Sequence, residues 1–185
     1  MGSVRGLVLA GGRSSRFGSD KALALYEGVS FLERAVSLLK ALDLKPIVVT
    51  RRGVTYSFIK CVGVQDKLPD LGPLGGLYTA MTVFKNTTFL VLSCDMPALT
   101  PQVLSELLTK HEPCCPITAY STQDRGVQPF PAVYEPSLLG IIREKLKKNS
   151  LSMLGLFEEV PNKKIISWAG DSALFCNVNE KEVNT

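Results

Sequence analysis

The sequence predicts a three-layer α/β/α sandwich built on a mostly parallel sheet. Short, continuous runs of Val, Ile and Leu recur along the chain and alternate with amphipathic segments of helical period. Strands of this kind, apolar on both faces, are typical of a sheet that helices cover on both sides. With 185 residues, 45% of them hydrophobic, the chain can bury one substantial core, so we expect a single domain over residues 1–185.

Apolar runs between turn-forming residues predict the strands. In chain order these are Val4–Leu9, Pro46–Thr50, Lys60–Val64, Thr88–Ser93, Cys115–Tyr120, Ile165–Trp168 and Leu174–Val178. The stretch over residues 128–131, which holds two prolines, is expected to be an irregular crossing because proline interrupts regular structure.

Segments of helical period predict the helices, which are Phe31–Leu42, Leu74–Val83, Pro101–Lys110, Pro136–Lys147 and Leu151–Glu158. Two of them carry a start signal. Pro73 stands at the first turn of one, and Thr100 followed by Pro101 gives another an N-cap and first-turn pair. The single histidine, His111, is expected at the end of that second helix.

The loop after the first strand is rich in glycine and in positive charge. Its glycines, among them Gly11 and Gly12, let backbone amides approach a ligand where a Cβ would obstruct. Arg13, Arg16 and Lys21 add cations to these N–H donors, as a polyphosphate requires. The loop is neither a Walker A motif nor a dinucleotide-binding fingerprint, because the spacing of its glycines fits neither. It predicts a phosphate-binding loop.

Asp95 stands at the tip of another predicted strand, and in such sheets the ligand lies beyond the carboxyl ends of the strands. Mg²⁺ typically takes one or two carboxylates together with phosphate oxygens and water. Since Thr100 can cap the helix that follows, Asp95 is available for another role. We interpret it as a metal ligand.

Two further segments near predicted strand ends carry paired glycines or paired asparagines. Gly75 and Gly76 lie in the first turn of a predicted helix, where each glycine destabilises the helix by about 1 kcal/mol relative to alanine. Two such glycines in a row indicate that something packs closely against the backbone there, and we interpret this as a nucleotide. Asn177 and Asn179 alternate across one residue and are expected on the same face of a strand. Asn179 can alternatively cap a helix, with Glu182 completing a capping box.

Residues 9–22, Leu-Ala-Gly-Gly-Arg-Ser-Ser-Arg-Phe-Gly-Ser-Asp-Lys-Ala, resemble the signature loop of the nucleotidyltransferases, and among these most closely the molybdenum cofactor guanylyltransferases of the MobA type. Gly-Pro-Leu-Gly-Gly over 72–76, Cys-Asp-Met-Pro over 94–97 and Asn-Val-Asn over 177–179 are also similar. The resemblance implies a Rossmann-like nucleotidyltransferase fold. It implies transfer of GMP from GTP to the terminal phosphate of molybdopterin, with release of pyrophosphate.

The resemblance also assigns roles to residues. It implies Lys21, Arg16 and Asp95 as catalytic, Asp95 as the Mg²⁺ ligand, and Asn177 and Asn179 on the acceptor side. The implied GTP-binding set is Leu9, Ala10, Gly11, Gly12, Lys21, Thr50, Asp66, Gly75 and Asp95. Asp70 competes with Asp66 for the role of holding the guanosine.

One departure from the family pattern concerns the acceptor. Ser152 stands where a basic residue is expected to face the pterin. The preceding predicted helix carries a cationic run, Arg143, Lys145, Lys147 and Lys148, which is a candidate substitute.

Composition restricts the partners. A formal net charge of +4 without a basic stripe fits an anionic small molecule better than nucleic acid. No apolar run approaches the length of a membrane helix and no signal pattern is present, so we expect a cytoplasmic protein. The five cysteines lack zinc-site spacing and are expected to be reduced and buried. By resemblance, the partners are GTP, molybdopterin and, transiently, molybdenum-insertion proteins and molybdoenzyme chaperones.

Three alternatives stay open at this point. The first is cytidylyl transfer to molybdopterin, and the second is guanylyl or uridylyl transfer to another phosphate. The third, of a different class, is a non-catalytic nucleotide-binding domain.

Overall fold

The computed structural model describes residues 3–11, 20–68 and 70–178. Its main sheet has seven strands in the order β5-β4-β1-β6-β8-β7-β9. These are β1 (Val4–Ala10), β4 (Pro46–Thr50), β5 (Val62–Gln65), β6 (Thr88–Ser93), β7 (Ile117–Thr122), β8 (Gly126–Tyr134) and β9 (Lys163–Ser167). Strand β8 runs antiparallel to both of its neighbours, and the other pairings are parallel. The predicted mostly parallel sheet is therefore confirmed.

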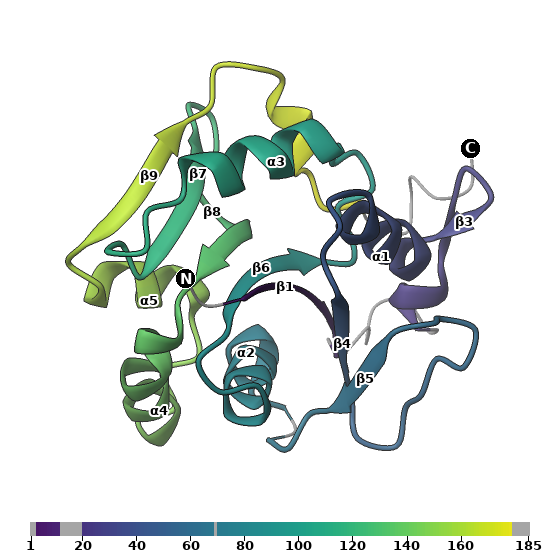
Figure 1. Ribbon diagram of the computed structural model, residues 1–185, viewed down its shortest axis with the longest axis horizontal. Coiled ribbons are helices and arrows are strands. Elements are labelled where there is room, and N and C mark those ends of the chain that lie inside the picture. Colours follow the sequence, from purple (N-terminus) through teal and green to yellow (C-terminus); the bar gives the residue numbers. More distant parts are fainter. Residues whose placement is uncertain (1–2, 12–19, 69, 179–185) are drawn as a thin grey trace.

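Helices cover both faces of this sheet (Figure 1). On one face lie α1 (Phe31–Ala41) and α3 (Pro101–Lys110). On the other lie α2 (Gly72–Val83), α4 (Leu139–Lys147) and α5 (Met153–Glu159). Short elements complete the chain: a hairpin of β2 (Leu25–Tyr26) and β3 (Val29–Ser30), and the 3-10 turns η1 (Lys21–Leu23), η2 (Pro136–Leu138) and η3 (Ser172–Phe175). The arrangement is the expected three-layer sandwich.

The core lies between these layers. Leu7 of β1 and Val91 of β6 are fully buried, as the continuous apolar runs predict. Helix α1 packs so closely on β1 that a Cβ at Gly6 would stand 2.5 Å from a methyl carbon of Leu39. Within the described residues, none of the helices combines the length and the hydropathy that spanning a bilayer requires.

Helix starts follow local capping chemistry. Ser30 accepts from the N–H of Glu33, whose carboxylate accepts from the N–H of Ser30, so a capping box begins α1. Thr100 accepts from the N–H of Val103 and caps α3, as predicted. At the other end of α3, His111 is the C-cap residue, also as predicted.

The prediction for residues 128–131 was wrong, because they belong to β8, in the interior of the sheet. The register explains the misleading signal. Strand β8 pairs with β7 at Gly126 and Val127 and again from Ala132 to Tyr134, and the register shifts in between. Pro129 and Pro131 lie in that irregular stretch, where a missing N–H costs no ladder bond.

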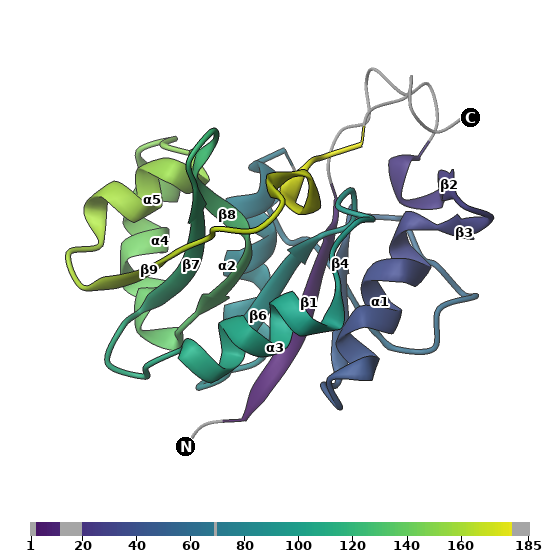
Figure 2. The same ribbon diagram turned by 90° about the horizontal axis from the view of Figure 1, so that it is seen from above.

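The predicted strand Leu174–Val178 was also wrong. Asp171 accepts from the N–H of Ala173 and turns the chain into η3, where Phe175 packs on Tyr120 and Trp168. In Figure 2 this yellow segment passes over the ends of the strands toward β1 and β4.

The cysteines differ in part from expectation. All five carry free thiols. Cys115 is buried, but Cys114 is exposed and the other three are half-buried.

Candidate active site

The carboxyl ends of β1, β4 and β6 come together at one edge of the sheet. Leu9 is in register with Ser93 of β6, and Ala10 with Thr50 of β4. A cleft of about 1070 Å³ opens at this edge, and Ala10 and Gly11 line it directly after β1. Strand β8 runs in the opposite direction, so its first half reaches the same edge and contributes Phe130.

Lys21 and Asp95 form an ion pair in this cleft. The Nζ of Lys21 lies 2.8 Å from Oδ2 of Asp95, and the two side chains are only 18% and 15% exposed. The hydroxyl of Ser93 donates to the other carboxylate oxygen of Asp95. The backbone carbonyl of Asp95 accepts from the N–H of Val178 at 3.0 Å. The carboxylate is therefore held in a defined orientation toward the cleft.

Cys94 precedes this aspartate and also lines the cleft. Burial, together with the neighbouring carboxylate of Asp95, raises the pKa of its thiol to about 12. The thiol is therefore neutral at physiological pH. Because the thiolate is the nucleophilic form, Cys94 is a poor candidate for covalent catalysis.

Asp66, directly after β5, also lines the cleft. Its Oδ1 accepts from the hydroxyl of Thr79 at 2.7 Å and from the N–H of Leu68 at 3.0 Å. Asp70 also lines the cleft and has a left-handed backbone, with φ of 70°. Both candidates for holding the guanosine thus border the same space.

The two glycines of α2 have protein neighbours. A Cβ at Gly75 would lie 2.9 Å from the Cβ of Leu71, and one at Gly76 would lie 3.0 Å from a methyl of Leu9. Close packing within the protein accounts for both glycines without a nucleotide. Gly76, and not Gly75, is among the residues that line the cleft.

Thr50 faces away from the cleft. It is buried, its hydroxyl donates to the carbonyl of Val54 at 2.8 Å, and it lines a smaller cavity on the far side of β4. The next two residues, Arg51 and Arg52, line the main cleft instead. Sequence reasoning missed these arginines, although their position directly after a predicted strand was the available signal.

The remaining predicted residues divide into two groups. Leu9 and Asn177 line the cleft. Gly12, Arg16 and Asn179 lie outside the residues that the structure describes.

Comparison with known proteins identifies the family. Residues 6–160 match the model of the MobA-like NTP transferase domain. The chain belongs to this family. A probable molybdenum cofactor guanylyltransferase of Flavobacterium johnsoniae is 28% identical over 98% of this chain and 95% of the relative. A probable molybdenum cofactor guanylyltransferase of Methanothermobacter thermautotrophicus is 31% identical over 95% of this chain and 94% of the relative.

A solved structure has the same fold. Molybdopterin-guanine dinucleotide biosynthesis protein A of Archaeoglobus fulgidus superposes with a TM-score of 0.81 at 20% identity, covering 96% of this chain and 93% of its own. As a member of the MobA-like family, the chain is a nucleotidyltransferase, a class of enzyme that generally uses a divalent metal ion.

The departure from the MobA-like pattern at Ser152 has a structural role. Its hydroxyl accepts from the N–H of Gly155 at 3.0 Å and caps α5, which therefore begins at Met153. The candidate substitute on α4 does not reach the cleft. Lys145 is only 2% exposed, and its Nζ lies 2.6 Å from Glu159 and 3.2 Å from the hydroxyl of Ser150. This lysine ties α4 to α5.

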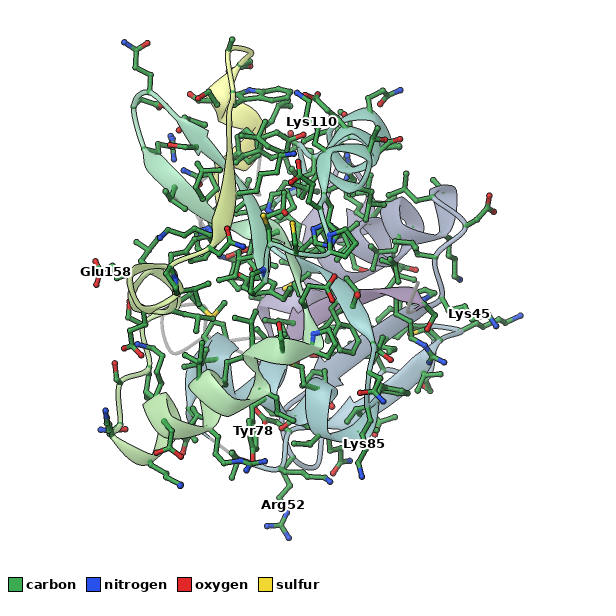
Figure 3. All side chains as sticks on the ribbon, turned by 60° about the vertical axis from the view of Figure 1, so that its left-hand side comes forward. Lys45, Arg52, Tyr78, Lys85, Lys110 and Glu158 are labelled. Atoms are coloured by element: carbon green, nitrogen blue, oxygen red, sulfur yellow. The ribbon has the colours of Figure 1, made fainter. Side chains whose placement is uncertain are left out.

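Positive charge in the described part of the chain is dispersed outside the cleft. In Figure 3, Lys45, Lys85 and Lys110 lie at three separate places on the molecule, each in a different segment. Within residues 3–11, 20–68 and 70–178, the cations that line the cleft are Lys21, Arg51, Arg52 and Arg125. Arg125, in the turn between β7 and β8, lines the cleft together with the apolar side chains of Phe130, Met153 and Phe175. The cleft therefore has a charged half beside β1 and β4 and a more apolar half beside β8.

Proposed function

We propose that this MobA-like enzyme transfers GMP from GTP to the terminal phosphate of molybdopterin. The products are pyrophosphate and molybdopterin guanine dinucleotide. The names of the relatives support this choice of substrates, and their similarity extends over almost the whole chain. The observation that carries the proposal is the Lys21–Asp95 ion pair in the cleft at which the parallel strands β1 and β6 end.

The reaction needs positioning more than acid–base chemistry. An oxygen of the acceptor phosphate attacks the α-phosphorus of GTP, a P–O bond forms, and the bond to the bridging α,β-oxygen breaks. Pyrophosphate leaves with the bonding electron pair. A phosphate monoester is already ionised near neutral pH, so no general base is required. The neutral thiol of Cys94 and the position of His111 outside the cleft's described lining fit such a mechanism.

Lys21 is the residue we assign to the triphosphate. Its ammonium lies in the cleft, where Asp95 orients it before substrate binds. As pyrophosphate departs, negative charge grows on the β-phosphate, and a fixed cation stabilises that charge most in a partly desolvated site. Arg16, which lies outside the described residues, is proposed as a second cation for the same phosphates.

Asp95 is the proposed ligand of Mg²⁺. Ser93 holds one oxygen of this carboxylate, and Lys21 lies beside the other. A carboxylate fixed in this way suits a hard divalent ion. When bound, Mg²⁺ would neutralise charge on the triphosphate oxygens. Lys21 and the backbone amides after β1 then orient the phosphate chain for in-line attack.

The two halves of the cleft suit the two substrates. We assign guanosine to the half that holds Asp66 and Asp70, since carboxylates accept from the adjacent N–H groups of guanine. Phe130, Met153 and Phe175 offer apolar surface for a pterin ring, and Asn177 is an uncharged polar group there. Since both substrates are cytoplasmic small molecules, we expect the reaction in the cytoplasm.

Pyrophosphate release tests the proposal. The protein is incubated with Mg²⁺, molybdopterin and each nucleoside triphosphate in turn, and the rate is compared with that without molybdopterin. We expect release with GTP that depends on the acceptor. Faster release with CTP would favour the cytidylyl alternative, and nucleotide binding without release under any condition would favour a non-catalytic domain.

A further inference from the structure

Tyr56 connects the loop after β4 to the segment that carries Lys21. The hydroxyl of Tyr56 donates to Oδ2 of Asp20 at 2.6 Å, across 36 residues of sequence. The guanidinium of Arg51 lies 3.7 Å from the same oxygen. The ring of Tyr56 packs edge-on against Phe58, with centroids 6.0 Å apart. Two side chains from the β4–β5 connection therefore hold one oxygen of Asp20.

The other oxygen of Asp20 holds the turn that begins with Lys21. Oδ1 accepts from the N–H of Ala22 at 3.2 Å and caps η1. The carbonyl of Asp20 accepts from the N–H of Leu23 at 2.9 Å. With both carboxylate oxygens engaged, Asp20 fixes the orientation of η1 relative to β4. It thereby fixes the direction in which Lys21 leaves the backbone toward Asp95.

The Tyr56 contact persists over a wide pH range. Burial raises the pKa of the Tyr56 hydroxyl above its ordinary value, and the neighbouring carboxylate of Asp20 raises it further. The hydroxyl is therefore protonated, and able to donate, throughout the range in which an enzyme assay is run. A hydrogen bond to a charged acceptor is among the stronger kinds in proteins.

We propose that Tyr56 is a positioning residue for nucleotidyl transfer, acting through Asp20 to hold Lys21 where it meets the triphosphate. Tyr56 is not itself among the residues that line the main cleft; it lines the smaller cavity behind β4. Its hydrogen bond to Asp20, which does line the main cleft, is the contact through which we expect it to act on η1. The inference rests on the proposed function, in which Lys21 contacts the phosphates.

The test is a double-mutant cycle between Tyr56→Phe and Lys21→Met. Tyr56→Phe removes one hydroxyl and keeps the ring that packs on Phe58. Tyr26→Phe is the matched control, because it removes a hydroxyl from a ring that packs on Phe31 and Arg34. The dissociation constant of GTP with Mg²⁺ is measured for every variant by calorimetry. The kcat/KM for GTP is measured where turnover allows, and the melting temperature is measured without nucleotide.

We expect Tyr56→Phe to weaken GTP binding and lower kcat/KM about tenfold, the order of magnitude of one lost hydrogen bond to a charged group. In the Lys21→Met background, the same change should alter GTP binding less than about twofold, because the residue it positions is gone. Tyr26→Phe should change neither quantity.

Two results would overturn the inference. One is an unchanged affinity and turnover in Tyr56→Phe. The other is an equal loss of GTP affinity with and without Lys21, accompanied by a lower melting temperature, which marks a general structural role. If wild-type protein binds GTP but releases no pyrophosphate with molybdopterin, the proposed function fails, whereas the binding cycle still decides the role of Tyr56. Absence of nucleotide binding in wild type overturns both.

Discussion

The ammonium of Lys21 lies 2.8 Å from the carboxylate of Asp95 although 74 residues separate them in sequence. Asp95 follows β6 closely, and η1 places Lys21 in the same cleft, at the edge of the sheet where β1 and β6 end. Each residue holds a partner of opposite charge in a site shielded from most of the solvent. The cleft is thus prepared for a charged ligand before any ligand binds.

Replacing Asp95 by Asn tests the metal role. The substitution is nearly isosteric, and the backbone carbonyl that accepts from Val178 is unaffected, so we expect the melting temperature to change little. Loss of the charge that holds a metal against phosphate should lower kcat roughly 10²-fold or more. Pyrophosphate release is the measurement, with Asp43→Asn, on an exposed turn after α1, as the control. Near wild-type release at saturating Mg²⁺ would show that Asp95 is not the ligand, and unfolding would show that its role is structural.

Nucleotide preference should follow Asp66. Its carboxylate is fixed by Thr79 and by the N–H of Leu68, so it can meet the paired N–H donors of guanine at little entropic cost. A ligand raises the melting temperature according to its affinity, so GTP with Mg²⁺ should shift it more than CTP does. Asp66→Asn should remove most of the GTP shift. If Asp70→Asn removes it instead, Asp70 is the guanosine ligand.

Arg125 should affect the acceptor and not the nucleotide. It lines the more apolar half of the cleft, and its Nε lies 3.3 Å from Asp124, which in turn accepts from the hydroxyl of Ser172. These contacts tie the β7–β8 turn to η3. We expect Arg125→Ala to raise the KM for molybdopterin about tenfold while the affinity for GTP stays the same. Arg143→Ala, on the exposed side of α4, is the control and should change neither.

Much of the charged half of the site could be predicted from sequence. Asp95 follows a continuous apolar strand, and such strands in a parallel sheet deliver the residues after them to one edge. The apolar half could not be predicted in the same way. Its Phe130 comes from the antiparallel strand β8, whose prolines led to a prediction of irregular structure. Its Phe175 comes from a 3-10 turn that was predicted as a strand. In both places, pairing and packing with distant segments decide the conformation.

Lys145, on helix α4, shows the same limit of prediction from sequence. Its neighbours Arg143, Lys147 and Lys148 are exposed, so the run has the composition of a solvated face. Only the packing of α4 against α5 brings Glu159 to the ammonium of Lys145 and buries that one cation. The pattern of charges on α4 alone therefore cannot predict that a carboxylate of α5 pairs with one of its lysines.

The burial of this ion pair is unequal, which predicts unequal costs for removing its two members. Lys145 is 2% exposed and Glu159 is 52% exposed. Glu159→Gln leaves a buried ammonium without its counter-charge and should lower the free energy of unfolding by about 2–3 kcal/mol. Lys145→Met keeps the buried aliphatic stem and leaves a carboxylate that water can solvate, so the loss should be about 1 kcal/mol. Urea denaturation measures both values, and kcat/KM per folded molecule should stay at the wild-type level in each. If Lys145→Met costs more than Glu159→Gln, or if it selectively raises the KM for molybdopterin, the purely structural role of Lys145 is wrong.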